Sequence, residues 1–292
     1  RWRKSVANGM NFGSCVGPYV PSSEAILLET GAASGQLSAA LYTVARTVEQ
    51  QSNIKNAIIS NSAYPLLLFA MLIAALMLAS YMVIPTFSEI LPTEEWTGFA
   101  GIVAQVTDFI RNNGTGIGVF MLMAILVIAF SLPRWTGRTR LPFENVIPWS
   151  LYRMWQGSAF LLSVSSMMSA GVKLDDVSLK RIGKSADPYL AERIDSVKRY
   201  ITSGANLGDA LYNTGYKFPD EEIIADLRIY ARLRDFDKNL VKITRAWVEE
   251  LVEKVSQIMK VLNVIVLFLI AVVIGVLISA LYGVVQQIQV QT

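Results

Sequence analysis

The chain has 292 residues, of which 53% are hydrophobic and 17% are charged, and its net charge is +3. Water-soluble domains carry about a quarter of charged residues, so this composition is typical of a membrane protein. The sequence has no histidine and one cysteine, Cys15, which excludes Ser-His and Cys-His nucleophile pairs, histidine metal sites, an internal disulfide and a thiolate cluster. The small net charge, without a basic run, gives no indication of nucleic-acid binding.

The N-terminal segment is predicted to be part of a helical bundle. It begins Arg1-Trp2-Arg3-Lys4, without an initiator methionine and without the apolar core of a signal peptide. We therefore expect the chain to be a fragment whose opening helices lie upstream.

Three stretches of the chain lack Asp, Glu, Lys and Arg: Asn56–Ser88, Asn112–Pro133 and the residues after Lys260. A helix needs about 20 apolar residues to cross the hydrocarbon core of a bilayer. The apolar part of each stretch reaches that length, which predicts three transmembrane helices. The predicted order is a partial bundle at 1–63, spans at 64–84, 115–132 and 261–285, an outward loop at 85–114, a second bundle at 133–260 and an outward tail at 286–292.

The distribution of Lys and Arg predicts the orientation, because cytoplasmic flanks of membrane helices are enriched in these residues. The loop at 85–114 contains only Arg111 against four acids, whereas basic residues precede the first and third spans and follow the second. We expect both bundles to be cytoplasmic and the loop and the C-terminus to face outward.

The outward loop is predicted to contain an amphipathic helix that covers the span ends. Its apolar residues share one helical face: Phe99, Ile102, Val103, Val106 and Ile110. Trp96 suits a position at the membrane interface. Gly114 and Gly118 have the spacing of a helix-packing motif, but we expect them to end the loop.

No ionisable residue lies within a predicted span, which argues against an ion-coupled transporter. In the third span, Gly275, Ser279 and Gly283 recur every four residues and form a stripe where another helix could approach closely. This stripe favours self-association, although glycine is also frequent in membrane helices in general.

The segment 133–260 is helical in its pattern throughout. Asp187-Pro188 and Asn206 are expected to begin two helices, and Asp220 to Glu222 place acids in the first turn of a third. No Gly or Pro occurs from Asp220 to Ile274, and an apolar stripe runs from Leu240 to Leu262. We predict a long helix that enters the third span without a hinge.

A basic group at Arg228, Arg232, Arg234 and Lys238 is a candidate docking patch for an acidic partner. The alternative is ordinary solvated surface. Two other motifs are not interpreted as sites. Ser178 to Ser185 ends like a phosphate-binding loop but lacks the first glycine, so its basic residues Lys180, Arg181 and Lys184 are expected to be solvated. The acids at 220–222 are explained by helix capping without a metal.

An internal repeat relates the two ends of the chain. Gly9 to Gly13 reads Gly-Met-Asn-Phe-Gly and Gly204 to Gly208 reads Gly-Ala-Asn-Leu-Gly, and each is followed by a proline that opens a helix. Downstream, three matched pairs lie 199 positions apart: Leu41 and Leu240, Arg46 and Arg245, Lys55 and Lys254. A fixed offset between matched residues indicates a duplicated unit.

The sequence resembles the inner-membrane platform proteins of type IV pilus and type II secretion systems. The run Gly31 to Leu37 is close to that family's Gly-Glu-x-Ser-Gly-x-Leu signature, and Ala170 to Leu174 is similar to its Ala-Gly-Val-x-Leu motif. The signature glutamate is Ala32 here, which puts a metal-binding role in doubt. The divergence resembles the type IVb or conjugative-pilus branch.

The resemblance implies an all-α membrane protein of the bacterial inner membrane, with two repeated cytoplasmic helical bundles, the first truncated, and three transmembrane helices. It implies a platform that is not an enzyme and has no cofactor. This platform links a hexameric secretion ATPase to pilin or pseudopilin subunits and to other inner-membrane assembly proteins. It is expected to be a homo-oligomer in contact with lipid. The alternative function is a subunit of an oligomeric transporter or channel.

Overall fold

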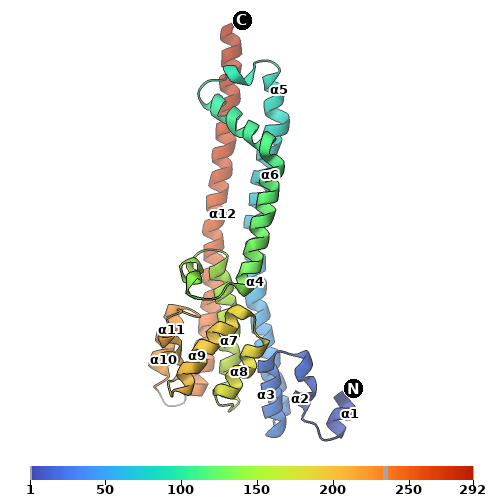
Figure 1. The fold of residues 1–292 in the computed structure, drawn as a ribbon, viewed down its shortest axis with the longest axis vertical. Coiled ribbons are helices and arrows are strands. Elements are labelled where there is room, and N and C mark those ends of the chain that lie inside the picture. Colours follow the sequence, from blue (N-terminus) through green and yellow to red (C-terminus); the bar gives the residue numbers. More distant parts are fainter. Residues whose placement is uncertain (1, 233–235, 292) are drawn as a thin grey trace. The chain divides into compact units, whose positions relative to one another are not determined.

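The computed structural model describes residues 2–232 and 236–291, and within those ranges it contains helices and no strand (Figure 1). The predicted all-α class is therefore confirmed. The chain divides into two compact units. One is Arg1–Ile58 with Ala129–Val255, and the other is Ile59–Ile128 with Ser256–Thr292. The helices α4 (Leu37–Leu78), α6 (Phe99–Arg134) and α12 (Phe236–Gln291) each have residues in both units.

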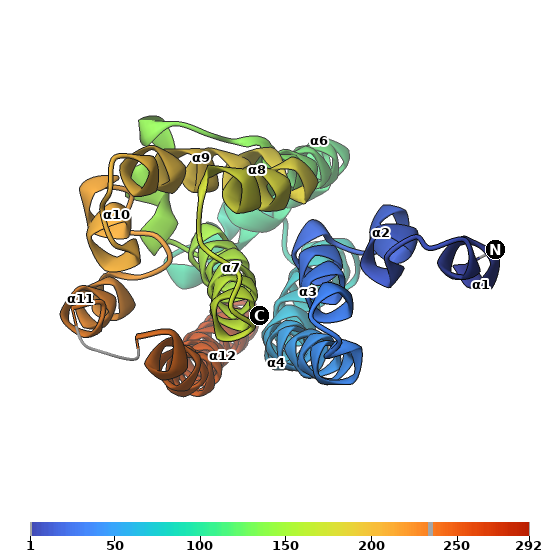
Figure 2. The same cartoon turned by 90° about the horizontal axis from the view of Figure 1, so that it is seen from below.

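The first unit is a helical bundle around α7 (Trp149–Ser169). Besides its parts of α4, α6 and α12, it contains α1 (Trp2–Ala7), α2 (Phe12–Val16), α3 (Ser22–Ala33), α8 (Asp176–Ser185), α9 (Pro188–Thr202), α10 (Leu207–Asn213), α11 (Glu221–Tyr230) and the 3-10 segments Gly17–Tyr19 and Arg138–Asn145. Figure 2 shows α7 between α3 and α4 on one side and α12 on the other, with α8 and α9 alongside. Most residues of α7 are buried, as expected for a helix with neighbours around it.

Side-chain caps begin the helices of this unit where the sequence predicts them. Asp187 accepts from the backbone N–H of Leu190 at the start of α9, and Asn206 accepts from that of Asp209 at the start of α10. Asp220 caps α11, whose first turn contains Glu221 and Glu222. Each cap supplies an acceptor for an N–H that has no partner inside its helix.

The two bundles predicted at 1–63 and 133–260 pack together in one unit, which differs from the sequence-based division. The Ser163 hydroxyl lies 3.3 Å from that of Ser23, and the Thr47 hydroxyl lies 2.8 Å from that of Ser166. These contacts join α7 to α3 and α4.

Three helical segments are long and apolar enough to cross a membrane: Leu37–Ser88, Phe99–Arg134 and Asn239–Gln287. They contain the three predicted spans. The first consists of α4, a π-helical turn at Ala79–Val83 and α5 (Ile84–Ser88). The turn precedes Pro85, which has no N–H to continue a regular ladder of hydrogen bonds. The third confirms the predicted long helix, since α12 continues through Gly275 and Gly283.

The predicted loop helix and the predicted second span are not separated by a break, because α6 is one helix through both. Gly114 and Gly118 lie inside it and do not end a loop. A Cβ at Gly114 would lie 2.6 Å from the Tyr81 hydroxyl, so glycine permits a close approach of that side chain. Helical hydrogen bonding continues because backbone groups in an apolar environment need partners within the chain.

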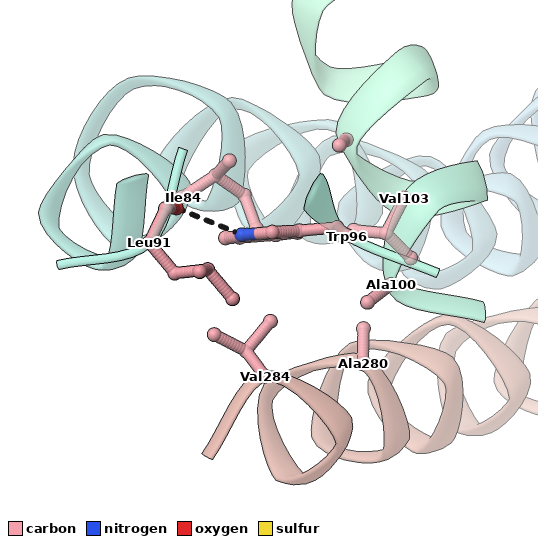
Figure 3. Packing of buried hydrophobic residues seen from close by; sticks show 8 residues of the cluster. Ile84, Leu91, Trp96, Ala100, Val103, Ala280 and Val284 are labelled. Carbon is pink, nitrogen blue, oxygen red and sulfur yellow. Dashed lines mark hydrogen bonds between the residues drawn. The ribbon is translucent and has the colours of Figure 1, made fainter. Parts of the chain in front are cut away.

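The residues that were expected to share one apolar face in the loop at 85–114 differ in how exposed they are. Phe99, Ile102 and Val106 are exposed, whereas Val103 is buried. Trp96 is 5% exposed, and its indole N–H donates to the Leu91 carbonyl at 2.9 Å. Figure 3 shows the cluster around it, which consists of Ile84, Leu91, Trp96, Ala100, Val103, Ala104, Ala280 and Val284. The loop therefore folds onto the end of α12.

Candidate functional site

The repeat is visible in the geometry of two helix crossings in the first unit. Gly13 of α2 faces α3, and an added Cβ would lie 2.2 Å from the backbone nitrogen of Glu29. Gly208 of α10 faces α11, and an added Cβ would lie 2.5 Å from the backbone nitrogen of Arg228. The two crossings use equivalent residues, because Glu29 and Arg228 are 199 positions apart. Each copy is therefore a module with the same close helix pair.

The charged residues at these equivalent positions have different partners. Glu29 accepts from the Ser14 hydroxyl at 3.1 Å and from Arg181 of α8 at 2.8 Å. The hydrogen bond from Arg181 holds the pKa of Glu29 below the ordinary value of a glutamate. Arg181 therefore joins the two copies, which corrects the expectation that it is a solvated cation. Lys180 forms an exposed ion pair with Asp176, and Lys184 is exposed.

Arg228, the first residue of the predicted docking patch, is engaged within its own module. Its Nε donates to Asp209 at 3.0 Å, and its guanidinium lies 3.9 Å from the centre of the Tyr212 ring. The hydrogen bond from Arg228 lowers the pKa of Asp209. Arg232 is exposed after the end of α11. Arg234 and the side chain of Lys238 lie outside the described residues.

Two grooves run beside this patch on α11. One has a volume of about 600 Å³ and is lined by residues that include Tyr212, Lys217 and Arg228. The other, of about 440 Å³, is lined by Ala225, Arg228, Ile229 and Arg232. The structure thus brings Arg228 and Arg232 to one groove, which gives a partner a concave surface with two cations.

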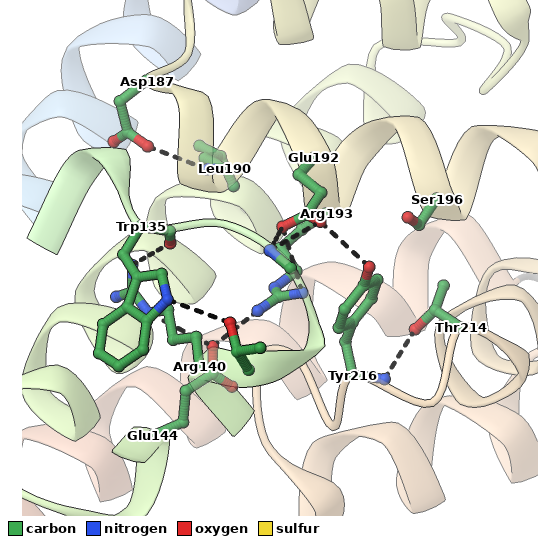
Figure 4. A network of polar contacts seen from close by, with 12 residues as sticks. Trp135, Arg140, Glu144, Asp187, Leu190, Glu192, Arg193, Ser196, Thr214 and Tyr216 are labelled. Atoms are coloured by element: carbon green, nitrogen blue, oxygen red, sulfur yellow. Dashed lines mark hydrogen bonds and ion pairs between the residues drawn. The ribbon is translucent and has the colours of Figure 1, made fainter. Parts of the chain in front are cut away.

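A buried polar network that the sequence does not predict fixes the C-terminal end of α6 to α9 (Figure 4). Arg140 donates to the carbonyls of Leu132 and Trp135 at 2.6 and 2.9 Å. Glu144 accepts from Arg193 at 2.7 Å, and its carboxylate lies 3.7 Å from the Arg140 Nε. The side chains of these three charged residues are at most 1% exposed.

Aromatic rings complete the network. The guanidinium groups of Arg140 and Arg193 lie 3.8 and 4.9 Å from the centre of the Tyr189 ring, and burial raises the pKa of that tyrosine. Removing one partner of a buried ion pair leaves an uncompensated charge, so Arg140, Glu144 and Arg193 depend on one another, although the Arg140 Nε and the Glu144 Oε2 form no hydrogen bond within the described residues. The sequence shows Arg140 only as one of several cations after a span, which is why its role is not predicted.

The signature-like run Gly31 to Leu37 forms the tight turn between α3 and α4. A Cβ at Gly31 would lie 2.3 Å from that of Ala40, and Gly35 has a φ of +72°, where glycine is favoured. The Ser34 hydroxyl donates to the Thr30 carbonyl at 2.9 Å. Ala32 supplies no metal ligand, and the described residues contain no group of three or more acids, histidines or cysteines that could hold a metal ion.

The stripe of Gly275, Ser279 and Gly283 has no helix packed on it in the second unit. A Cβ at either glycine would meet no atom within 4 Å. The buried residues of this part of α12 are instead Ala280 and Val284, which contact the loop at 85–114. The stripe therefore stays a prediction of contact with another chain.

The family of type II secretion system protein F matches the chain at residues 2–85 and 160–283. The two matched segments correspond to the two copies of the module. The chain belongs to this family. The resemblance drawn from the repeat and the glycine-rich turn is thereby confirmed, together with the fold class of repeated helical modules and apolar helices.

The chain is similar to the toxin coregulated pilus biosynthesis protein E of Vibrio cholerae serotype O1. It is 20% identical over 227 residues, which are 77% of this chain and 65% of the relative. This chain of the protein F family therefore spans about two thirds of that protein's length.

Proposed function

We propose that this chain is a platform of a type IV pilus or type II secretion assembly machine in the bacterial inner membrane. The observation that carries the proposal is the duplication of one helical module within the protein F family, where α4 and α12 each contain module residues and an apolar stretch able to cross a membrane. Such a chain offers anchored protein surfaces. It acts by contact and force rather than by catalysis.

The proposed cytoplasmic partner is a hexameric secretion ATPase, and the proposed membrane partners are pilin or pseudopilin subunits and other inner-membrane assembly proteins. The helix α12 is continuous over 56 residues, and an unbroken helix is stiff along its axis. Displacement of its cytoplasmic end by the ATPase would therefore reach the bilayer, where it could lift a pilin into a growing fibre.

The groove at Arg228 and Arg232 is the proposed contact for an acidic surface of the ATPase. Arg232→Glu tests it, because Arg232 is exposed, whereas a change at Arg228 would also break the ion pair with Asp209. We expect Arg232→Glu to reduce co-purification of the ATPase with detergent-solubilised protein at least fivefold. Lys184→Glu, at an exposed lysine of α8, is the control and should leave it unchanged.

If folded Arg232→Glu protein binds the ATPase as the native chain does, this groove is not the contact for the ATPase. The platform function itself has a separate test, since deletion of the gene should abolish fibre assembly or secretion. Proteoliposomes containing the purified chain should show no solute flux. Flux of an ion or solute would instead support the alternative of an oligomeric transporter or channel.

A further inference from the structure

A small polar cavity lies in the first unit where α4, α7 and α12 meet. Its volume is about 150 Å³, well below the roughly 300–1,000 Å³ of pockets that enclose drug-sized ligands. Arg46 of α4 and Arg245 of α12 both line it. These arginines are the equivalent residues of the two copies, 199 positions apart, so each copy contributes one arginine to the cavity.

The other groups that line the cavity are mostly hydroxyls and amides, including Thr43, Gln50, Ser165, Ser166 and Ser169. The Thr43 hydroxyl donates to the Ala39 carbonyl at 2.9 Å and that of Ser169 to the Ser166 carbonyl at 2.8 Å, whereas the Ser166 hydroxyl pairs with that of Thr47 at 2.8 Å. Hydroxyl hydrogens rotate, so these groups can turn toward a bound acceptor. The lining thus offers donors at several positions.

No carboxylate offsets the two arginines. Among the described residues, no Asp or Glu lines this cavity, and neither Arg46 nor Arg245 forms an ion pair. This differs from the other arginines that join elements of the unit, since Arg181, Arg193 and Arg228 all contact a carboxylate. Two unpaired cations on one small cavity repel each other, and an anion between them would remove that repulsion.

We propose that this cavity binds a phosphate group. A phosphate carries about 1.5 to 2 negative charges at neutral pH and several acceptor oxygens, which matches two arginine forks and a set of hydroxyls better than a single carboxylate does. The volume admits one such group, either as free phosphate or as the phosphate end of a nucleotide whose remainder lies outside. The bound phosphate connects α4 with α12. The inference concerns binding alone and does not depend on the platform function.

The test is a titration of the purified full chain in detergent with inorganic phosphate, against chloride at the same ionic strength. Thermal unfolding and the ³¹P line width of the phosphate are the two readouts. We expect saturable stabilisation and line broadening with the native chain. Arg46→Gln and Arg245→Gln should each weaken the apparent affinity at least tenfold, and Arg46→Lys should weaken it less, because lysine keeps the charge but loses the fork.

Lys242→Gln is the matched control, since Lys242 is an exposed cation one turn before Arg245 on α12 that does not line the cavity. It should bind phosphate as the native chain does. A second titration with adenosine triphosphate identifies the source: tenfold tighter binding that is lost in Arg245→Gln indicates a nucleotide, and equal binding indicates free phosphate. Absence of a phosphate effect beyond that of chloride, or an equal loss in Lys242→Gln, would overturn the proposal.

Discussion

Glycine residues set how closely two helices approach in each copy of the module. At Gly208 an added Cβ would lie 2.5 Å from the backbone of Arg228, where no flexible side chain can move away. At Gly183 of α8, by contrast, the added Cβ would make an ordinary contact of 3.6 Å with Ile194. The same residue type thus has a packing role at one position and none at the other.

We expect Gly208→Ala to destabilise the fold by about 1–3 kcal/mol, because the overpacked crossing must open. Gly183→Ala should be neutral or stabilising by up to about 1 kcal/mol, because alanine is the better helix former. Thermal or denaturant unfolding of both variants in detergent checks this. Equal stability of the two would contradict the packing role of Gly208.

The contact between Glu29 and Arg181 predicts a pH dependence at the residue scale. The folded-state pKa of Glu29 is depressed, so the pair stabilises the fold above the ordinary glutamate pKa and this contribution disappears as the pH falls through the folded value. Arg181→Gln should lower stability at pH 7 by less than about 1 kcal/mol, since the side chains of Arg181 and Glu29 are 42% and 26% exposed.

The stability difference between the native chain and Arg181→Gln should shrink as the pH falls below the ordinary glutamate pKa, and it should vanish once Glu29 of the folded chain is protonated. The double variant with Glu29→Gln should be no less stable than Arg181→Gln alone, because both changes remove one interaction. Melting curves from pH 3 to pH 8 measure both effects. A difference that is constant with pH would show that the ion pair is not its cause.

At the scale of elements, α12 has two different faces in its apolar part. Ala280 and Val284 are covered by the loop at 85–114, whereas Gly275 and Ser279 are exposed. In a bilayer, helices associate through close packing of small residues rather than through the hydrophobic effect. The uncovered stripe is therefore the face of α12 where we propose that a second copy of the chain approaches.

We expect Gly275→Leu to weaken self-association in detergent or lipid at least fivefold without unfolding the chain, because a large side chain separates the helix backbones. Ile274→Leu is the control, since it changes the neighbouring exposed residue at almost constant volume. Fluorescence energy transfer between labelled chains in liposomes gives the association constant. Equal association of both variants would exclude the stripe as a contact.

At the scale of the whole molecule, the charge distribution predicts which segments face the cytoplasm. A thiol-reactive label can reach cysteines introduced in the loop at 85–114 and in the module segments, because Glu94 in the loop and Ser203 after α9 are exposed. The native Cys15 is 8% exposed and gives little background. A single introduced cysteine therefore reports the side of the membrane on which it lies.

In intact cells whose outer membrane has been permeabilised, a membrane-impermeant maleimide should label Glu94→Cys and leave Ser203→Cys unlabelled. After lysis both should react. We expect this result because the excess of Lys and Arg next to the module segments keeps those segments in the cytoplasm. Labelling of Ser203→Cys before lysis would reverse the predicted orientation.

The local sequence determined the helices, their caps and the apolar stretches, because each depends on residues within a few turns of one another. The repeat follows from comparing two parts of the sequence at a fixed offset. Asp187 and Asn206 begin helices where their spacing predicts, and the offset of 199 positions marks equivalent residues. These features need no knowledge of distant contacts. The repeat and the glycine-rich turn also predicted the family to which the chain belongs.

Only the tertiary structure decided which of these helices share a core and which charges meet. The contact of Arg181 with Glu29 spans 152 positions and that of Arg193 with Glu144 spans 49, so no sequence window contains both partners. The burial of Trp96 likewise depends on Ala280 and Val284, which are distant in the sequence. Packing selects among the partners that local patterns allow, because desolvation and close contact act only between groups that the fold brings together.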